Sequence, residues 1–252
     1  MKGDSMSERE VILITGGTGK IGSCFVRHFH DKGDVVIYTG RTEDELQELQ
    51  SLGDGVCGIA VDFHKGNPVE AIVSVLEKHN LKVTALVNAA RDLSTLAVGE
   101  DGEISKENWL GEYDVDVVFP YQLTRALAKT HPLKTVVNIS SMYGMNSFNP
   151  HLYAGEFHPV LQYACAKAAL IHLTKCLAVC LADKKIMVNC ITYGGVEGRV
   201  DDAFKSRYAN LCPLGRMMKP EEAVPALDFL IHGNSRYMTG QNIIVDGGWS
   251  AW

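Results

Sequence analysis

Thr15-Gly16-Gly17-Thr18-Gly19-Lys20-Ile21-Gly22 is the stretch that decides the fold, because it joins a short apolar run to a helix-length segment. The run Val11–Thr15 is apolar and β-branched, and Ile21–Asp31 has apolar residues at three- and four-residue spacing. Glycines in such a turn let the backbone approach a pyrophosphate, which the positive end of the following helix stabilises. The stretch therefore predicts a dinucleotide-binding turn, and a plain tight turn is the alternative.

Short apolar runs and amphipathic segments alternate along the rest of the chain. The further runs are rich in Val and Ile, as expected of strands buried on both faces: Val35–Tyr38, Val56–Val61, Val83–Asn88, Thr135–Ser140, Met187–Thr192 and Asn242–Val245. The segments between them have helical spacing: Glu43–Leu52, Pro68–His79, Lys106–Lys129, Pro159–Ala182 and Pro220–His232. This alternation predicts an α/β fold, a Rossmann-type doubly wound sheet of seven parallel strands, with residues 1–252 in a single domain.

The composition is that of a soluble globular protein, with 252 residues, 46% hydrophobic, and a formal net charge of -6. No uninterrupted apolar stretch approaches the about 20 residues that span a bilayer. The first ten residues are polar and lack the core of a signal peptide. No basic block is present to neutralise phosphates, which argues against nucleic acid. We therefore expect a cytoplasmic protein that binds no membrane and no nucleic acid.

The cysteines predict no disulfide framework and no metal site. They are seven in number, sit mostly inside apolar runs and show no zinc-finger spacing. We expect all of them to be small, reduced core residues: Cys24, Cys57, Cys165, Cys176, Cys180, Cys190 and Cys212.

A cation follows the second predicted strand. A Rossmann fold that binds NAD usually presents an Asp or Glu to the ribose about 20 residues after the glycine turn. Here Ile37-Tyr38-Thr39-Gly40-Arg41 places an arginine there, which can bind a 2′-phosphate with two hydrogen bonds, and Lys20 can add a second charge. The sequence predicts NADP as cofactor; the alternative is NAD, with Arg41 only a solvated residue at a helix start.

Further motifs follow in a fixed order: Asp62 after the third strand, Asn88-Ala89-Ala90 after the fourth, Ser140-Ser141 after the fifth, then Tyr163-Ala164-Cys165-Ala166-Lys167, and Thr239–Gly248 near the end. In this order and at this length the chain resembles the short-chain dehydrogenase/reductase family, in its ordinary branch of about 250 residues, over nearly its whole length. Ser141-Met142-Tyr143-Gly144 and the ending Asp246-Gly247-Gly248-Trp249 are similar to a subgroup from bacterial surface-glycan and flagellin-sugar gene clusters.

The resemblance implies which residues contact NADP or NAD, with Asp62 against the adenine and Val196 against the carboxamide. The full implied set is Gly16, Thr18, Gly19, Lys20, Ile21, Gly22, Arg41, Asp62, Phe63, Asn88, Ala89, Ala90, Tyr163, Lys167 and Val196.

Tyr163 and Lys167 are four residues apart, so on a helix they share one face. An ammonium beside a phenol stabilises the phenolate, so Tyr163 can exchange a proton with a substrate oxygen while hydride moves on the nicotinamide. The resemblance implies that Ser141 holds the same oxygen. The alternative for the pair alone is a surface helix contact. We expect an oxidoreductase that interconverts an alcohol and a carbonyl, on a sugar or a sugar-derived acid.

Several positions depart from the family pattern. A glycine has moved to Gly19, and this spacing resembles the extended branch of sugar-nucleotide epimerases and dehydratases. Asp116 replaces a catalytic Asn and is expected to pair with Lys167, while Pro120 is expected to bend the same helix. Gly198 replaces a threonine that reaches the cofactor. These departures motivate two alternatives: a catalytically impaired nucleotide-binding regulatory or scaffold protein, and a sugar epimerase or dehydratase.

Three stretches, at about 91–105, 142–158 and 194–215, are expected to be the substrate loops. Tyr163 follows Ser141 at more than the family spacing, so the second loop is enlarged. We expect Tyr153, with the residues His151, Glu156 and His158, to hydrogen-bond a polar ligand; a surface flap or subunit contact is the alternative. The long helices of residues 106–129 and 159–182 predict a homodimer or homotetramer.

Overall fold

The computed structural model describes residues 9–155, 157–233 and 235–252, which form one sheet of seven parallel strands in the order β3-β2-β1-β4-β5-β6-β7. The strands are β1 (Val11–Thr15), β2 (Val35–Gly40), β3 (Val56–Ala60), β4 (Ala85–Asn88), β5 (Thr135–Ser141), β6 (Met187–Tyr193) and β7 (Asn242–Val245). The predicted doubly wound α/β fold is therefore confirmed.

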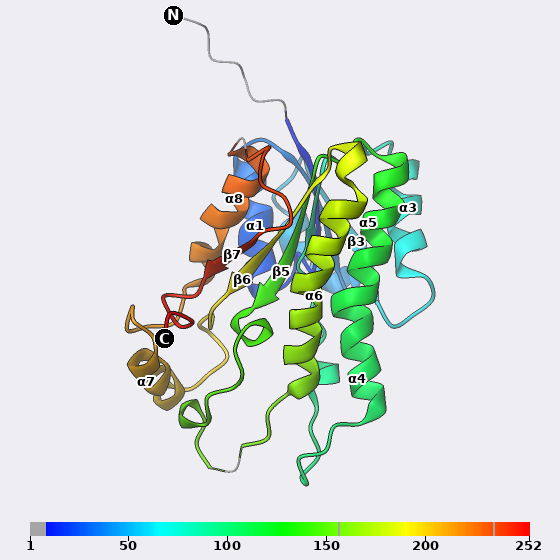
Figure 1. Cartoon of the computed structure of the whole chain (residues 1–252). Coiled ribbons are helices and arrows are strands. Elements are labelled where there is room, and N and C mark those ends of the chain that lie inside the picture. Colours follow the sequence, from blue (N-terminus) through cyan, green and yellow to red (C-terminus); the bar gives the residue numbers. More distant parts are fainter. Residues whose placement is uncertain (1–8, 156, 234) are drawn as a thin grey trace, which may run out of the picture.

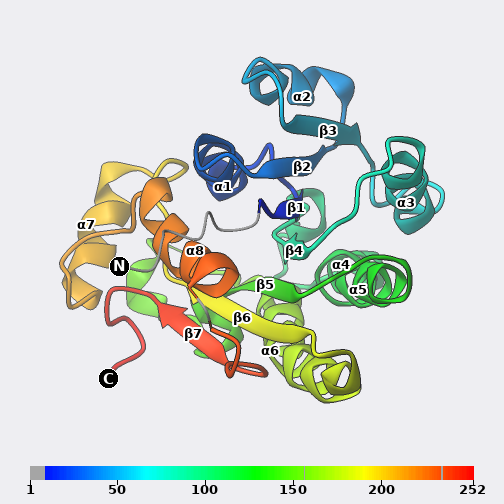
Figure 2. The same cartoon turned by 90° about the horizontal axis from the view of Figure 1, so that it is seen from above.

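Helices cover both faces of this sheet (Figures 1 and 2). One face carries α1 (Lys20–Asp31), α2 (Glu43–Gln50) and α8 (Val224–His232); the other carries α3 (Pro68–Lys78), α5 (Phe119–Thr130) and α6 (Leu161–Cys180). Successive strand residues point to opposite faces, so Ile14 of β1 packs in the first core and Leu13 in the second. Burial on both faces explains why the strands are almost wholly apolar.

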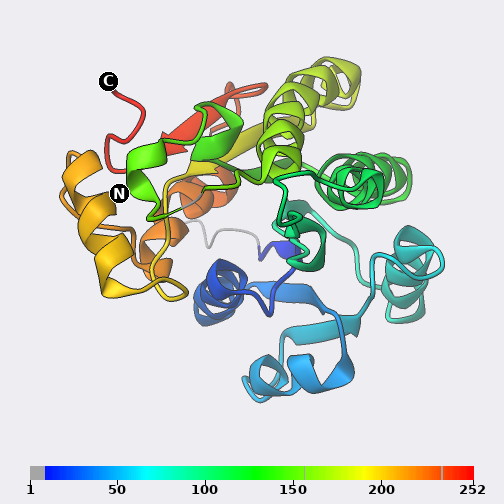
Figure 3. The same cartoon turned by 90° about the horizontal axis from the view of Figure 1, so that it is seen from below.

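The carboxyl ends of all seven strands meet at one edge of the sheet, the lower edge in Figure 1. Figure 3 looks onto this edge, where the β1–α1 turn lies beside the segments that follow β4, β5 and β6. In the register, Thr15 pairs with Asn88, and Ser141 pairs with Tyr193. The strand order reverses between β1 and β4, which is where an open α/β sheet forms its ligand crevice.

The helix predicted over Lys106–Lys129 has a wider turn in its middle. It consists of α4 (Lys106–Tyr113), a π-helical turn Asp114–Val118, and α5. Pro120 has no N–H to donate to the carbonyl of Asp116 four residues earlier, which disfavours a regular α-helical turn there. The predicted bend is therefore a local change of helix type.

The remaining elements are short or lie at the rim: α7 (Asp202–Leu211) and the 3-10 turns Ser94–Leu96, Met142–Gly144, Pro150–Leu152, Ala182–Lys184 and Pro220–Ala223. The chain between β6 and β7 thus contributes only α7 and α8 as full helices within the described residues.

Helix α6 corrects one expectation. Cys165, Cys176 and Cys180 are exposed on it, so the prediction that every cysteine is buried was wrong; only Cys190 and Cys212 are buried. The helix is also long and apolar enough, by length and composition, to cross a membrane, with a mean hydropathy of 1.3. It packs on β5 and β6, however, as a helix of the core. Because α6 is apolar on nearly all sides, sequence context did not separate its inner face from its outer face.

Candidate active site at the carboxyl ends of the strands

The turn between β1 and α1 runs very close to the chain that follows β4. Gly16 has a backbone φ of +68°, and a Cβ there would lie 2.7 Å from the Cα of Ala90. A Cβ at Gly22 would lie 2.2 Å from the carbonyl oxygen of Gly16. Helix α1 begins at Lys20 with no side-chain cap and no acidic residue in its first turn, within the described part of the chain. Its first N–H groups are therefore available to an anion, and the turn fits a pyrophosphate.

Thr15 fixes this turn against β4, a role that the motif analysis missed. Its hydroxyl accepts hydrogen bonds from the amides of Ala89 and Ala90, at 3.1 and 3.2 Å. The signal was a polar residue at the last position of an apolar strand. Asn88, by contrast, directs its side chain into the sheet and donates to Asn138 at 2.8 Å.

Arg41 lies at the outer end of the crevice, after β2, with 53% of its side chain exposed. Its guanidinium is 3.5 Å from Asp92. Hydrogen bonds from Lys65 and from the amide of His64 lower the pKa of nearby Asp62. Arg41 is thus a largely exposed cation that contacts Asp92 at the edge of the sheet.

Lys20 does not lie beside Arg41. Its ammonium donates to the carbonyl of Glu197 at 2.5 Å, on the β6 side of the crevice. Burial, and then the charges of Arg199 and Arg91, lower the pKa of Lys20. The structure therefore does not bring the two predicted phosphate-binding cations together.

Other predicted cofactor residues line the same edge. The Thr18 hydroxyl lies 3.5 Å from Glu45, Ile21 packs against the first core, Phe63 contacts Phe119 with ring centroids 4.4 Å apart, and Val196 forms a β-bridge with Met218. They bracket the crevice from β2 to β6.

Tyr163 and Lys167 project from one face of α6, and both are buried. The Lys167 ammonium lies 5.8 Å from the centroid of the Tyr163 ring. It donates to the Asp116 carboxylate at 2.9 Å and to the carbonyl of Ile139 at 3.1 Å. Burial alone would lower the pKa of Lys167, but the charges of Asp116 and Tyr163 and the hydrogen bond that Lys167 donates to Asp116 outweigh it and raise the pKa. The expected pairing of Asp116 with Lys167 is confirmed, and the lysine stays an ammonium.

The two serines that end β5 have different partners. Ser140 is buried and donates to the carbonyl of Lys167 at 3.0 Å, which fastens α6 to the sheet. Ser141 is half-buried, and its oxygen accepts from the amide of Tyr143 at 3.3 Å. Ser141 is therefore the member of the pair with a hydroxyl that is not tied to α6.

Two charged residues that sequence reasoning missed complete the surroundings of Tyr163. The guanidinium carbon of Arg91 lies 4.6 Å from the centroid of the Tyr163 ring. Glu112 is buried, one helical turn before Asp116, and bonds the hydroxyl of Thr95. Burial, and then the Asp116 charge, raise the pKa of Glu112 to about 7. Only the four-residue spacing of Glu112 and Asp116 hinted at this pair.

The enlarged loop 142–158 is built from aromatic side chains. Tyr143 stacks on Phe148 and Tyr153 stacks on Phe157, each with ring centroids 4.1 Å apart. The hydroxyls of Tyr143 and Tyr153 are 2.5 Å apart, and burial raises the pKa of both. The loop therefore presents neutral phenols and ring faces.

The predicted histidine ligands lie elsewhere in this region. His151 is exposed on its 3-10 turn, and His158 lies against Gly102 of the first loop, where a Cβ would be 2.9 Å from Nδ1. Glu156 lies outside the described residues. Of the predicted polar ligands, the structure places only Tyr153 in the aromatic cluster with Tyr143.

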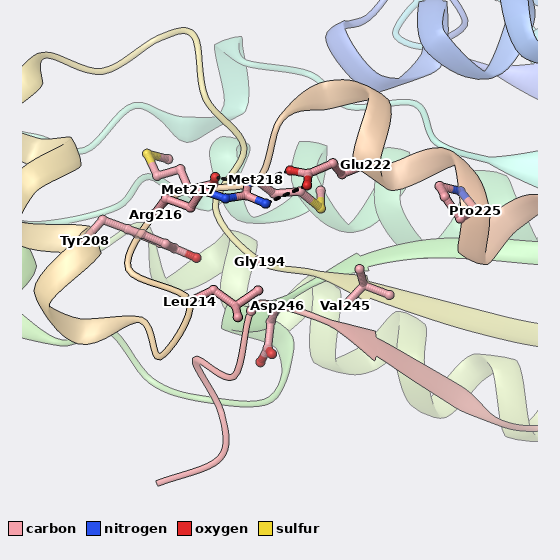
Figure 4. A pocket seen from close by; sticks show the side chains of 11 residues that line it. Gly194, Tyr208, Leu214, Arg216, Met217, Met218, Glu222, Pro225, Val245 and Asp246 are labelled. Carbon is pink, nitrogen blue, oxygen red and sulfur yellow. Dashed lines mark hydrogen bonds and ion pairs between the residues drawn. The ribbon is translucent and has the colours of Figure 1, made fainter.

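A separate cavity of about 340 Å³ lies between β6, α7, α8 and β7 (Figure 4). Tyr208, Leu214 and Met217 line it, and an ion pair of Arg216 with Glu222 borders it. Neither Ser141 nor Tyr163 lines this cavity among its described walls. In the described residues, no group of three or more His, Cys, Asp or Glu side chains is arranged to hold a metal ion.

Comparison with known sequences gives the family context of this geometry. Residues 18–250 match the sequence profile described as enoyl-(acyl carrier protein) reductase. The short-chain type dehydrogenase/reductase y4vI of Sinorhizobium fredii is 32% identical over 252 residues; the match covers 95% of this chain and 43% of that protein. The 3-oxoacyl-[acyl-carrier-protein] reductase FabG of Chlamydia pneumoniae is 30% identical over 253 residues, covering 94% of this chain and 95% of that protein.

Solved structures with a similar fold are also dehydrogenases. A short chain dehydrogenase from Leptospira borgpetersenii with bound NAD+ superposes with a TM-score of 0.83 at 28% identity, covering 96% of this chain and 93% of that one. A 4-hydroxyisoleucine dehydrogenase complexed with NADH superposes with a TM-score of 0.85 at 25% identity, covering 97% and 100% of the two chains.

Proposed function

The chain belongs to the short-chain dehydrogenase/reductase family, and on this premise we propose that it interconverts an alcohol and a carbonyl with NADP(H) as the hydride carrier. One observation carries the proposal. Tyr163 lies at the strand-end crevice with a buried ammonium, Lys167, held 5.8 Å from its ring centroid by Asp116 and the Ile139 carbonyl. A protein that only bound a nucleotide would have no need of this buried charge pair, which is costly without a chemical role.

Each side chain has a distinct task in this mechanism. A nicotinamide cofactor bound beside Tyr163 would supply hydride transfer to or from the carbon that carries the substrate oxygen. Tyr163 takes the proton of the alcohol oxygen during oxidation and gives it back during reduction. Lys167 stabilises the phenolate, Asp116 keeps the lysine charged and in place, and Ser141 donates a hydrogen bond to the substrate oxygen.

The preference for NADP over NAD rests on Arg41. No carboxylate follows β2 directly, and an exposed guanidinium stands there instead. The similar structures named above contain NAD+ or NADH, so the choice of cofactor is a property to be tested on this chain. A sugar or sugar-derived acid as substrate follows the resemblance to the glycan-cluster subgroup.

The outer face of α6 bears on how copies of the protein associate. The outer face of α6 exposes Leu161, Cys165 and Val179, the last at 80%. Apolar groups on an outer helix face favour burial against a second copy, so we propose a homodimer or homotetramer that uses α4, α5 and α6. We place the protein in the cytoplasm, without membrane or nucleic-acid partners.

The proposal is tested with the purified protein and a panel of secondary alcohols and their carbonyl compounds. Fluorescence titration gives the Kd for NADPH and NADH, and single-turnover absorbance follows hydride transfer. Tighter binding of NADPH, with hydride transfer to at least one carbonyl compound, is the expected result. Binding without any hydride transfer would support the regulatory or scaffold alternative, and cofactor that is regenerated within each cycle would support the epimerase alternative.

A further inference from the structure

We infer that Arg91 binds a carboxylate of the substrate, so that the site acts on a short hydroxy acid or oxo acid. The inference rests on the proposed function and names the substrate class of the same site. Arg91 directly follows Ala90 at the end of β4, and its guanidinium carbon lies 4.6 Å from the centroid of the Tyr163 ring. A cation at this distance is held over the ring face, beside the hydroxyl that exchanges the proton.

Within the described residues no carboxylate forms an ion pair with Arg91, although the Arg91 charge acts on buried Glu112 and opposes the rise of its pKa. The neighbouring carboxylate, Asp92, lies 2.5 Å from His64 with one oxygen and accepts from the amide of Ser94 at 2.8 Å with the other. Glu112 is buried and bonds the Thr95 hydroxyl. No carboxylate of residues 9–155, 157–233 or 235–252 forms an ion pair with Arg91. Its donors are therefore free for a ligand.

Positive charge is in excess at this point of an otherwise acidic chain. The formal net charge is -6, yet Arg91 and Arg199 both lie near enough to Lys20 to lower its pKa. Lys20 stands at the start of α1, where a pyrophosphate would bind. The guanidinium carbon of Arg91 lies over the ring of Tyr163 instead. A bound carboxylate would relieve the repulsion that these cations otherwise exert on one another.

The geometry also limits the size of the substrate. A guanidinium is a planar fork that donates two parallel hydrogen bonds to a carboxylate at about 2.8 Å. With Arg91 stacked on the ring of Tyr163, such a carboxylate lies within a few bonds of the carbon that reacts at the Tyr163 hydroxyl. Tyr143, which is close enough to Tyr163 to feel its charge, stacks on Phe148 and contributes aromatic surface to this region.

The test compares two dead-end probes, malonate and its neutral counterpart malonamide, by calorimetric titration of the enzyme–NADP+ complex. Wild-type protein is expected to bind malonate at least about tenfold more tightly than malonamide. Arg91→Gln should remove this difference, and Arg91→Lys should keep part of it because the charge remains without the fork. Arg27→Gln is the matched control, since Arg27 pairs with Glu48 on the surface of α1; it should bind both probes like wild type.

Equal binding of the two probes to wild type, no measurable binding of malonate, or unchanged malonate binding in Arg91→Gln would overturn the inference. A loss of NADP+ affinity in Arg91→Gln with unchanged malonate binding would assign Arg91 to the cofactor phosphates and also overturn it. The probes need no turnover. Protein that binds malonate through Arg91 but transfers no hydride would refute the proposed function alone, and hydride transfer without a preference for malonate would refute only the inference.

Discussion

The two halves of the crevice are built from different materials. The half that we propose to bind the nucleotide, the nucleotide half, comprises the 15–22 turn and the ends of β1 to β4, where backbone meets backbone: a Cβ at Gly16 would lie 2.7 Å from the Cα of Ala90. The half that we propose to bind the substrate, the substrate half, comprises the described residues of the segment 142–158 and α7, where aromatic side chains stack and Arg207 donates to the carbonyl of Leu152 at 2.7 Å. The first half leaves no room for other residues, whereas the second is a side-chain assembly that different sequences can replace.

Because of this difference, cofactor binding and substrate specificity would depend on separate parts of the molecule. Dinucleotides are ligands that many enzymes share, and they require the backbone of the glycine turn to come close. Steric contacts therefore exclude side chains from this turn. The substrate half has its own small core of Met142, Tyr208 and Trp249, apart from the two cores of the sheet. Changes in the second half can therefore alter the substrate without disturbing the sheet, and each prediction below acts on one half or on their border.

Removal of the Tyr163 hydroxyl should have the largest effect and should separate the two halves fully. Tyr163→Phe loses the proton donor but keeps the ring beneath Arg91, so turnover should fall by at least about a hundredfold. The Kd for NADPH should stay within about twofold of wild type, because the turn is untouched. Stopped-flow hydride transfer and fluorescence titration measure the two quantities. Wild-type turnover in this variant would remove Tyr163 from the mechanism.

Gly16→Ala should break the nucleotide half. The added methyl group meets the backbone of Ala90, and φ at +68° is unfavourable for any side chain. We expect the Kd for NADPH to rise about thirtyfold, which corresponds to roughly 2 kcal/mol. Gly33→Ala is the control: φ is +90°, but no described atom beyond its chain neighbours lies within 4 Å of the new methyl group. Equal effects of the two variants would show that the close approach is irrelevant.

Glu112 lies at the border between the halves and should make stability depend on pH. Its folded-state pKa of about 7 is above the ordinary value of 4.5, so the folded protein holds this proton more tightly than the unfolded chain. The resulting stability is complete below about pH 4.5 and is lost as the pH rises through 7.

Glu112→Gln should remove this dependence. Wild type should lose about 2.5 kcal/mol of unfolding free energy between pH 5 and pH 8 that the variant does not lose. Urea unfolding at a series of pH values measures this difference. Glu107→Gln, an exposed position on the same helix, should leave the wild-type slope unchanged. Parallel curves for wild type and Glu112→Gln would mean that Glu112 is ionised at neutral pH.

Arg41→Gln should have the smallest effect, because the arginine is half exposed and its phosphate contact is screened by solvent. The Kd for NADPH should rise about fivefold while the Kd for NADH stays the same. A parallel loss of affinity for both cofactors would show that Arg41 does not distinguish them. Lys65→Gln, a neighbouring exposed cation that pairs with Asp62, serves as the charge control.

The sheet and the nucleotide turn could be predicted because the residue types that they require are set by neighbours close in the sequence. Buried strands need apolar residues on both faces, and a turn as tight as that at Gly16 excludes side chains. The pairing of Asp116 with Lys167 followed from the family resemblance, which places Asp116 where the family has a catalytic Asn. The sheet and the turn depend on few partners, so the chain displays them directly.

Arg91, Glu112 and Thr15 could not be recognised because their roles depend on contacts with distant segments. Glu112 matters through Thr95, 17 positions earlier, and Arg91 through the ring of Tyr163 on α6. The histidines of the enlarged loop were expected to be ligands because histidine often is one. His151 is instead exposed on the 3-10 turn that Asn149 caps, and His158 lies against Gly102.

The π-helical turn Asp114–Val118 determines how the site would respond to the deletion of a single residue. A π turn holds one residue more than an α turn, so deletion of a single codon here would yield an uninterrupted α-helix of the same length. Because the wide turn absorbs the additional residue, its removal would leave the orientations of α4 and α5 nearly unchanged, and Glu112 would remain beside Thr95. A frame-preserving loss of one amino acid would then move only the residues of the turn itself, among them Asp116, which pairs with Lys167, so natural variants of this length offer a ready comparison.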